Sequence, residues 1–498
     1  MKKYIFNRIL RSLVSIFLIT TLIYAIIFTM VPRKLIFQQD STYSKMAADP
    51  DRKTNYENSV FEKMGYIQYM TSKELQQAAS EIDESVTVEV NSKNESIYKD
   101  YIKSIGSGWK LEQLPNSGSF FATREVPIYE RVFKFYANLV QIDHPWKIQD
   151  ETNPDLERYI RVENDPSIGW SVVGSGTKHK YLLYVNGSFP FIHQNFVTLN
   201  LGVSYPTYSN TPVLQVISQG QGQKRSTEVT FPNGKTMSST VDIYSRTYQS
   251  PSKADSRSKT FYGDDPYSNT LNNYKDPSMI EMSARIGLVG IILAYAIALP
   301  LGSYMARFKN ALFDRGSTAF LTFLMAIPSI ALIYVVRFVG SNLGLPDVFP
   351  TLGAHNILSY VLPSLILAIL YVPSLALWVR RYLIDLQHSD FVRFARAKGL
   401  SEKEIADKHI FKNAMVPIIA GVPGALLAVI VGATLTETIF AYPGMGKMLI
   451  DSVRAANNSM VVGLSFIFSA LSIIALLLGD LLMTVLDPRI KLSDKGGK

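Results

Sequence analysis

Long apolar runs alternate with polar stretches along this chain, and six of the runs are long enough to cross a bilayer. A hydrocarbon core about 30 Å thick requires about 20 mostly apolar residues in helical form. The predicted spans cover residues 12–31, 280–305, 316–339, 359–379, 416–436 and 460–485. The pattern therefore predicts an α-helical polytopic membrane protein with six transmembrane helices, in which one helix is followed at a distance by a block of five.

The 248 residues between the first two spans, 32–279, contain no apolar run of this length. Short segments at 86–90, 181–185 and 228–231 read as β-strands, and Asn233-Gly234 is typical of a hairpin turn. Two stretches, 55–80 and 126–142, have helical spacing, and the second is predicted to place on one face Ile128, Val132, Phe133, Tyr136, Leu139 and Val140. We expect a large mixed α/β domain between helices 1 and 2.

The first apolar run follows four basic residues, Lys2, Lys3, Arg8 and Arg11, as the core of a secretory signal does. It is about 20 residues long, however, which exceeds the apolar core of a signal peptide. It is also followed by Val31-Pro32-Arg33-Lys34, which contains no pair of small residues for cleavage. We therefore expect an uncleaved anchor that forms the first transmembrane helix.

Lysine and arginine gather in alternate loops of the chain. Loop 341–358 has none and loop 437–459 has only two. Cytoplasmic loops carry an excess of basic residues, so the basic segments mark the cytoplasmic side. We expect both termini in the cytoplasm of a bacterial cell, residues 32–279 outside its plasma membrane, and a core over 280–498. The basic segments are 1–11, 306–315, 380–413 and the tail from 487.

Composition narrows the functional classes. Of the 498 residues 47% are hydrophobic and only 18% are charged, whereas about 25% charged is usual in soluble proteins. The chain has no cysteine, which excludes disulfides, cysteine-ligated zinc, iron–sulfur clusters and thiol catalysis. Residues 32–279 hold 27 basic and 28 acidic side chains, so the net charge of +9 belongs to the membrane block. It is a topology signal, and no basic surface remains for nucleic acid.

The cytoplasmic stretch 390–417 carries the most local information. Gly399 is a natural break between two helices, and Ser401 and Glu404 have the spacing of a capping box. Leu400 and Ile405 occupy the positions of a hydrophobic staple. These features predict a helix from Glu402 that ends before Pro417. Spacing alone leaves two interpretations open: a basic amphipathic helix on the lipid headgroups, or a rigid helix–turn–helix inserted into a groove of a partner.

The same stretch resembles a known family. Ala395, Gly399 and 413–417 are similar to the EAA loop of permease subunits of ABC importers. Arg393 stands where that pattern has glutamate, and the interval from Gly399 to Pro417 is long; both departures resemble the oligopeptide and dipeptide branch. Further similarity lies in 436–446, in Asp480 with 487–490, and in 200–204 with 211–214. The insertion 218–275 resembles those of Gram-positive peptide permeases.

The resemblance implies the type I ABC importer permease fold and a subunit that forms half of a pore. It implies four kinds of partner: a second homologous permease, two cytoplasmic ATPases that bind ATP and Mg²⁺, an extracellular lipid-anchored peptide-binding protein, and a peptide substrate. No cofactor is expected in this chain, which lacks G-x-x-x-x-G-K-[ST]. The expected ATPase-coupling residues are Arg393, Ala395, Gly399, Leu400, Ser401, Glu404, Ile405, Lys408, Phe411 and Pro417.

Several other residues are weaker candidates for helix packing or gating. Charges inside a membrane are functional by default, but Glu281, Arg285 and Arg337, like others here, lie near predicted helix ends, where pairing or snorkelling is expected. The prolines are expected to kink helices. The candidates are Glu437, Pro443, Gly444, Asp480, Pro328 and Pro300.

Enzymatic chemistry in this chain is not expected, because it contains neither H-E-x-x-H nor G-x-S-x-G. The expected function is that of a permease subunit for oligopeptides. One alternative is a membrane-anchored sensor or enzyme whose active part is 32–279. Another is the same permease architecture with a cargo such as nickel or opines.

Overall fold

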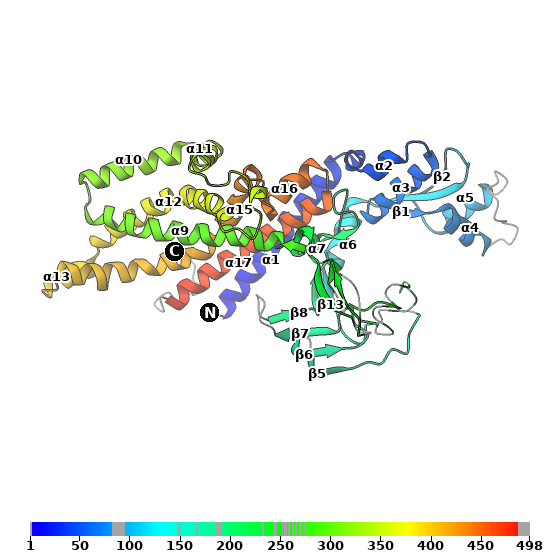
Figure 1. Ribbon diagram of the computed structural model, residues 1–498, viewed down its shortest axis with the longest axis horizontal. Helices are drawn as coiled ribbons and strands as arrows, with labels where there is room; N and C mark the ends of the chain where they lie inside the picture. Colours follow the sequence, from blue (N-terminus) through cyan, green and yellow to red (C-terminus); the bar gives the residue numbers. More distant parts are fainter. Residues whose placement is uncertain are drawn as a thin grey trace.

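The computed structural model of the chain consists of a block of long helices and an α/β segment inserted after the first helix (Figure 1). The structure describes all residues except 1, 82–94, 148–149, 151, 166–167, 186–191, 232–233, 243–246, 251, 253–255, 257–258, 261–262, 264–265, 268–270, 273 and 487–498. The large α/β segment and the apolar helices confirm the predicted fold class.

Within the described residues, five helices are long and apolar enough to cross a membrane. A bent helix pair forms a sixth candidate. The helices of the block are α1 (Lys2–Met30), α9 (Met279–Arg307), α10 (Leu312–Ala326), α11 (Ser329–Asn342), α12 (Leu358–Gln387), α13 (Asp390–Ala397), α14 (Glu402–Glu404), α15 (Lys412–Ile439), α16 (Met445–Arg454) and α17 (Asn458–Leu486).

The third predicted span, 316–339, is wrong as one straight helix. α10 ends at Ala326, α11 begins at Ser329, and the two axes differ by 106°. The break falls at Pro328, which cannot donate to the preceding turn and forces Ile327 into extended backbone (ψ 129°). The pair is thus a broken span or a re-entrant loop.

A stripe of small residues lets α9 and α12 pack closely. Gly290, Ala294, Ala298, Gly302 and Ala306 recur every four residues on one face of α9, and all are buried. A Cβ atom on Gly302 would lie 2.6 Å from the carbonyl oxygen of Ala376 in α12, so the two backbones nearly touch. Small residues at helix contacts are the usual basis of packing in membranes, where apolar burial gives little drive.

The first and last helices of the block pack against one another. α1 lies along α17 in Figure 1, and a 2.5 Å ion pair joins Arg8 of α1 to Asp480 of α17. Asp480, predicted as a packing or gating residue, therefore links the N-terminal and C-terminal helices. The related motif at 487–490 lies outside the described residues.

The inserted segment begins with a small α/β unit. Its sheet has the order β1-β3-β2, with antiparallel pairing throughout. Aromatic side chains from α1 and from this unit share one hydrophobic cluster, which fixes the unit against the C-terminal end of α1. The elements are η1 (Arg33–Phe37), α2 (Ser41–Lys45), α3 (Pro50–Lys63), β1 (Ile67–Met70), α4 (Ser72–Ser80), α5 (Glu95–Ser104), β2 (Trp109–Gln113), β3 (Phe120–Glu125) and α6 (Ile128–Leu139).

A second sheet and several short antiparallel pairs follow α6. The sheet has four strands in the order β5-β6-β7-β8. These elements are β4 (Val140–Ile142), β5 (Ile160–Asp165), β6 (Gly169–Gly174), β7 (Tyr181–Val185), β8 (Ile192–Gln194), β9 (Val197–Leu199), β10 (Val203–Ser204), β11 (Thr211–Pro212), α7 (Val213–Ser218), β12 (Gln221–Lys224), β13 (Thr227–Thr230), β14 (Thr236–Ser239), β15 (Val241–Asp242), β16 (Leu271–Asn272) and β17 (Tyr274–Asp276).

The predicted elements of this segment are confirmed in part. The strand at 181–185 is β7, and the hairpin is the β13–β14 pair, although Asn233 lies outside the described residues. The strand at 86–90 lies outside them as well. The single helix over 55–80 is wrong: β1 interrupts it and pairs with β3, a long-range contact that the spacing does not reveal.

The helix over 126–142 is shorter than predicted. α6 ends at Leu139, and Val140 begins β4, which pairs with β9. The predicted apolar face also divides, because Val132 packs against the cluster at the end of α1 while Phe133 is 73% exposed. α6 is therefore apolar on two sides, and the described residues cover only one of them.

Candidate coupling site on the α13–α14 turn

The turn between α13 and α14 is built around one glycine. Gly399 has φ +76°, in the left-handed region that L side chains rarely adopt. Its N–H donates to the carbonyl of Arg396 (2.9 Å), and the N–H of Leu400 donates to that of Ala395 (3.3 Å). These two bonds close the end of α13 as a glycine C-cap. Figure 1 shows α13 at one extremity of the helical block.

The predicted capping box is confirmed. The N–H of Glu404 donates to Ser401 Oγ (3.3 Å), and the N–H of Ser401 donates to Glu404 Oε2 (3.2 Å). Leu400 and Ile405, the predicted staple, belong to one hydrophobic cluster. The chain direction is thus fixed on both sides of Gly399 by local bonds, because the N–H groups of Ser401 and Glu404 at the start of α14 both have acceptors.

The predicted end of the helix before Pro417 is wrong. Residues Ile405–Phe411 form π-helical turns, and α15 continues from Lys412 to Ile439 with Pro417 inside it. Membrane helices tolerate proline, because packing of neighbouring helices compensates for the lost hydrogen bond. Here Ala414 and Ile418, which flank Pro417, are both buried. The coupling segment is therefore continuous with a membrane helix.

One face of the turn is packed into the helical block. Val392, Ala395, Ile405 and Ile410 are buried in a cluster that also contains residues of α9, α12 and α15. Displacement of the turn must therefore displace these helices, because close-packed interiors transmit strain instead of absorbing it.

No described residue covers the opposite face of the turn. Phe394 is 69% exposed, and Phe411 and Arg393 are also exposed. An exposed aromatic ring among charged residues, on a rigid turn, has the character of a protein contact site. Lys408 lies 3.7 Å from Glu404 on the same surface.

An ion pair bridges the two helices of the turn. Arg396 of α13 donates from Nε and Nη2 to the two carboxylate oxygens of Glu402 in α14, at 2.7 and 3.1 Å. The hydrogen bond to Glu402 raises the pKa of Arg396 above its ordinary value. Both side chains are exposed, so the pair adds geometric definition and little stability.

A second ion pair, which sequence reasoning did not find, joins α10 to α12. The carboxylate of Asp314 is buried and accepts from Nε and Nη2 of Arg380 at 2.5 and 2.7 Å. It also accepts from the N–H of Asn310 at 2.8 Å. Asp314 lies in the basic segment 306–315, and the prediction of topology from charge uses only the lysine and arginine residues of such a segment. An isolated acid in a basic loop is the signal that would have marked it.

The candidate Glu437 lies at the other end of α15. Its side chain is 0% exposed, Oε1 accepts from Ser283 Oγ (2.6 Å), and Oε2 accepts from the N–H of Lys447 (2.9 Å). A Cβ on Gly444 would lie 2.3 Å from the Glu437 carboxyl carbon, so the loop approaches this carboxylate closely. Glu437 thus ties α9 and the start of α16 to α15, which is a helix-packing contact.

The remaining candidates occupy separate places. Pro443 precedes Gly444 in this loop, and its carbonyl accepts from Gln221 Nε2 (3.3 Å). Pro300 lies inside α9 without interrupting it, whereas Pro328 marks the break before α11. Glu281 and Arg285 pair with each other on α9, at 2.6 Å. Arg337 pairs with Asp347 (2.9 Å) and donates to the carbonyl of Ile439, the last residue of α15 (3.1 Å).

Comparison with known proteins agrees with this architecture. A family model described as "Binding-protein-dependent transport system inner membrane component" matches residues 298–492, which include the α13–α14 turn. Over 499 aligned positions the chain is 66% identical to the oligopeptide transport system permease protein AmiC of Streptococcus pneumoniae serotype 4, and the alignment covers 100% of both chains.

Other relatives match less than half of the chain. The chain is 32% identical over 217 residues to the dipeptide transport system permease protein DppB of Bacillus subtilis, covering 43% of this chain and 69% of that one. The corresponding protein of Lactococcus lactis is 29% identical over 215 residues. The resemblance predicted from the coupling segment is confirmed, and the chain belongs to the family of inner membrane components of binding-protein-dependent transport systems.

Proposed function

We propose that this chain is the permease subunit of an ATP-driven importer of oligopeptides and forms half of its translocation pore. The name of the relative that matches over the whole length supports the cargo class. The observation that carries the proposal is the rigid α13–α14 turn, with an exposed aromatic on one face and the helical block on the other. A transport subunit needs such a lever, whereas a passive anchor for an exterior sensor or enzyme does not.

The proposal includes the partners that this chain needs. A second, homologous permease completes the pore, two cytoplasmic ATPases bind ATP and Mg²⁺, and an extracellular lipid-anchored protein delivers the peptide. The absence of a phosphate-binding loop in the sequence supports ATPases on separate chains.

The orientation follows from the charge distribution. Residues 1–31 form the cytoplasmic start and first transmembrane helix, 32–279 an extracellular domain, and 280–498 the core, in the plasma membrane of a bacterium of Gram-positive type. The coupling loop 380–415 then faces the cytoplasm, together with the basic segments that favour that side.

Coupling is a rigid-body step in this proposal. When two ATPases close around ATP, the surface around Phe394 and Arg393 moves with them. The buried face, including Val392 and Ile405, then moves the ends of α9, α12 and α15. The helices of the permease move as rigid units between an inward-facing and an outward-facing state. Two discrete states are expected because closely packed helices do not deform continuously.

The test is copurification followed by reconstitution. The tagged full chain is purified in mild detergent from cells that express the whole transport system, and the associated subunits are identified. The purified assembly is then placed in liposomes with the peptide-binding protein outside, and uptake of a labelled oligopeptide is measured with and without ATP.

ATP-dependent peptide uptake is the expected result, with no competition from nickel or an opine at equal concentration. An assembly without an ATPase would contradict the coupling role. ATP-dependent uptake of nickel or an opine in preference to peptide would retain the permease and reject the cargo.

A further inference from the structure

Helix α6 lies alongside α1, and ring contacts show how far along α1 it reaches. The ring centre of Phe135 lies 5.3 Å from that of Tyr24, and the ring centre of Tyr136 lies 4.7 Å from that of Phe17. The Tyr136 hydroxyl also donates to the carbonyl of Phe17 (2.9 Å). At 1.5 Å per residue, Tyr24 and Phe17 lie about 9 and 20 Å from Met30, the C-terminal residue of α1. The second half of α6 is therefore level with the middle of α1.

The middle of α1 belongs to the membrane. Residues 12–30 of this span carry no charged side chain, and Arg11 precedes them directly. In helical form the uncharged stretch is about 29 Å long, which is about the thickness of a hydrocarbon core. Phe17 and Tyr24 lie inside the stretch and not at its ends. The second half of α6 is therefore level with acyl chains, and it meets them wherever no other part of the chain covers it.

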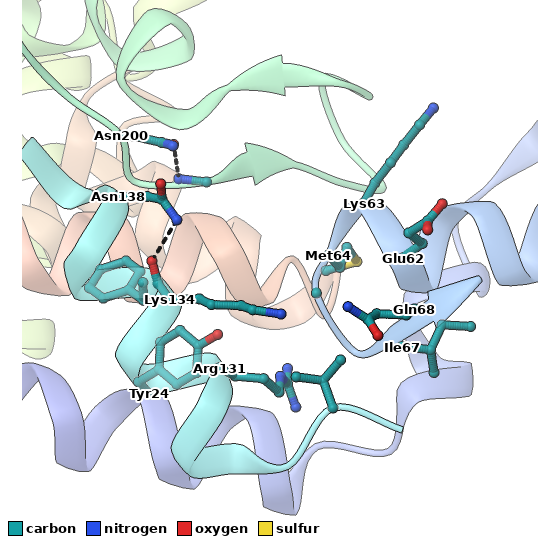
Figure 2. Close-up of a pocket in the computed structure, with 14 residues that line it drawn as sticks. Tyr24, Glu62, Lys63, Met64, Ile67, Gln68, Arg131, Lys134, Asn138 and Asn200 are labelled. Atoms are coloured by element: carbon teal, nitrogen blue, oxygen red, sulfur yellow. Dashed lines mark hydrogen bonds between the residues drawn. The ribbon is translucent and has the colours of Figure 1, made fainter. Parts of the chain in front are cut away.

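The polar side of α6 is turned toward the rest of the chain. Arg131, Lys134 and Asn138 line a cavity of about 340 Å³ between α1, α6 and the loop between α3 and β1 (Figure 2). Lys134 pairs with Glu130 at 2.7 Å, and Glu130 also pairs with Arg124 of β3 at 2.9 Å. The charge of α6 is thereby concentrated toward the cavity and β3.

A further side of α6 is apolar and uncovered by the described residues. Tyr129 and Phe133 are 75% and 73% exposed, and neither is among the residues that line the cavity. They are four residues apart, so they lie on the same side of the helix. A helix with charge on one side and uncovered aromatic rings on another has the character of a membrane-surface helix.

The β4–β9 ribbon, which follows α6 through β4, has an apolar face of its own. Val140 and Ile142 alternate along β4, share one face, and are 53% and 59% exposed. Leu199 of β9 lies opposite Val140, and Val197 lies opposite Ile142. Residues directly opposite in an antiparallel pair share a face, so this face of the ribbon carries four aliphatic side chains.

The backbone of this region is paired in the way that a lipid environment requires. Backbone groups in lipid have no water to bond to, so they must be satisfied within the protein. α6 provides its own bonds as a helix, and β4 pairs with β9. The pairing continues at both ends of the ribbon, where the N–H of Asp143 donates to the carbonyl of Phe196 (2.7 Å) and that of Asn200 to Leu139 (2.8 Å).

The chemistry of the uncovered side chains favours acyl chains over a protein partner. Protein interfaces carry about one hydrogen bond per 100–200 Å², so a docking surface needs polar groups among its apolar ones. The exposed side chains of Tyr129, Phe133, Val140, Ile142 and Leu199 offer one polar atom, the tyrosine hydroxyl. Tyr129 lies in the first turn of α6, the turn nearest the C-terminal end of α1, where a tyrosine hydroxyl reaches the lipid headgroups.

We propose that α6 and the β4–β9 ribbon are inserted into the lipid leaflet that surrounds the C-terminal half of α1, which is the outer leaflet in the orientation proposed above. Tyr129 lies at headgroup level, and Phe133, Val140 and Ile142 contact acyl chains. The inserted α/β segment is then held to the bilayer along α6 as well as through α1, which resists rotation of its base about α1. The inference rests on α1 crossing the membrane, and it is independent of the cargo and of the coupling turn.

The test uses the absence of cysteine in this chain. Phe133→Cys provides one labelling site, to which an environment-sensitive fluorophore is attached in the assembled transporter. The assembly is placed in liposomes that contain a brominated phospholipid, and quenching by that lipid is compared with quenching by iodide in the aqueous phase. The assembly without the substitution, labelled in the same way, gives the background from the other subunits.

Three further single-cysteine variants calibrate the result. Leu18→Cys, on an exposed side of α1, is the lipid control. Lys103→Cys, in α5 at the end of the inserted segment far from the helical block in Figure 1, is the water control. We expect lipid quenching at position 133 within about twofold of that at position 18, and iodide quenching at least about fivefold below that at position 103. Lys134→Cys, the neighbouring position on the cavity side, should be quenched less by lipid.

The other outcomes each reject the proposal. Strong quenching by iodide and none by lipid would place this surface of α6 in water. Protection from both quenchers would show that a protein, such as the second permease, covers it. If Phe133→Cys does not assemble, Tyr129→Cys takes its place, and iodide quenching there equal to that at position 103, without quenching by lipid, contradicts insertion.

Discussion

At the scale of single residues, Gly399 has a backbone conformation that residues with a Cβ atom rarely adopt. A β-branched residue at φ +76° is strained by about 1–2 kcal/mol, although no atom lies within 4 Å of the position a Cβ would take. We expect Gly399→Val to deform the α13–α14 turn and to lower ATP-dependent peptide uptake at least tenfold, with a normal amount of protein in the membrane. Uptake in whole cells and quantitative blotting measure the two effects.

The chain supplies a matched control for this substitution. Gly353 has φ +73° and equally open surroundings, but it lies in the loop between α11 and α12, away from α13. Gly353→Val carries the same backbone strain, and uptake should stay near the wild-type level. Equal losses in the two variants would show that strain alone is responsible, and not the coupling turn.

Asp314 and Arg380 allow a second prediction at this scale. Breaking a fully buried pair costs about 3–5 kcal/mol. The Arg380 side chain is 22% exposed, so the cost of leaving it unpaired is somewhat lower. Asp314→Asn should therefore lower the thermal unfolding temperature of the detergent-purified chain. The double variant with Arg380→Met and Asp314→Leu should lower it less, because no unpaired charge remains. The contact joins α10 to α12 in the structure, so a double variant as unstable as the single one would contradict the importance of this pairing.

At the scale of elements, α13 is an amphipathic helix whose exposed side carries Phe394. We expect Phe394→Ala to reduce copurification of the ATPases by about tenfold or more, because exposed aromatics at contact centres dominate binding energy. Phe338→Ala is the control, since that ring is similarly exposed (71% against 69%) but belongs to α11 and not to the α13–α14 turn. Full retention of the ATPases by the Phe394 variant would place the contact elsewhere.

The short segment after α1 is tied to β3 by a pair that responds to acid. Arg33 donates to both carboxylate oxygens of Glu125 at 2.8 and 2.6 Å, and this holds the pKa of Glu125 below its ordinary value of about 4.5. A depressed pKa contributes stability above the unfolded value and loses it as pH falls through the folded one.

We therefore expect acid unfolding of the inserted α/β segment to begin below about pH 4.5, and Glu125→Gln to remove part of that dependence. The effect is less than about 1 kcal/mol because both side chains are partly exposed. Fluorescence-monitored unfolding between pH 3 and 7 measures it. An identical pH profile in the variant would mean that other carboxylates carry the acid response.

At the scale of the whole molecule, one part of the inserted segment, residues 225–273, begins and ends at neighbouring points of the fold. β12 pairs with β17, with Lys224 opposite Tyr274, so the stretch 225–273 forms an outgrowth whose ends meet. Replacing that stretch by a two-residue linker should leave the core of α9 to α17 assembled with its ATPases. Copurification measures this, and loss of the ATPases would show that the outgrowth supports the core. Binding of the substrate-binding protein of the system, measured on the same sample, then tests whether the outgrowth serves receptor docking.

Local features were predictable from the sequence and long-range ones were not. The capping box at Ser401 and the glycine break at Gly399 involve neighbours within four residues, so their spacing sufficed. The apolar runs located most helices for the same reason. In contrast, Glu437 meets Ser283 across 154 positions, and only tertiary packing decides that contact.

Two errors share that origin. β1 interrupts the helix predicted over 55–80 because β3 is available for pairing, and Pro417 remains inside α15 because neighbouring helices hold it. A proline rule that is reliable for isolated helices fails in a membrane bundle. At Pro328 the rule held, and no spacing argument could have given the angle of 106°.

The ion pair between α1 and α17 has a practical consequence for observing transport. Because Arg8 and Asp480 hold the first and last helices together, a pair of spectroscopic labels on those two helices should report a constant separation throughout the cycle. That pair serves as a fixed internal reference. The distance from a third label on α13 to this reference then reports movement of α13 within the molecule, separate from tumbling of the whole molecule.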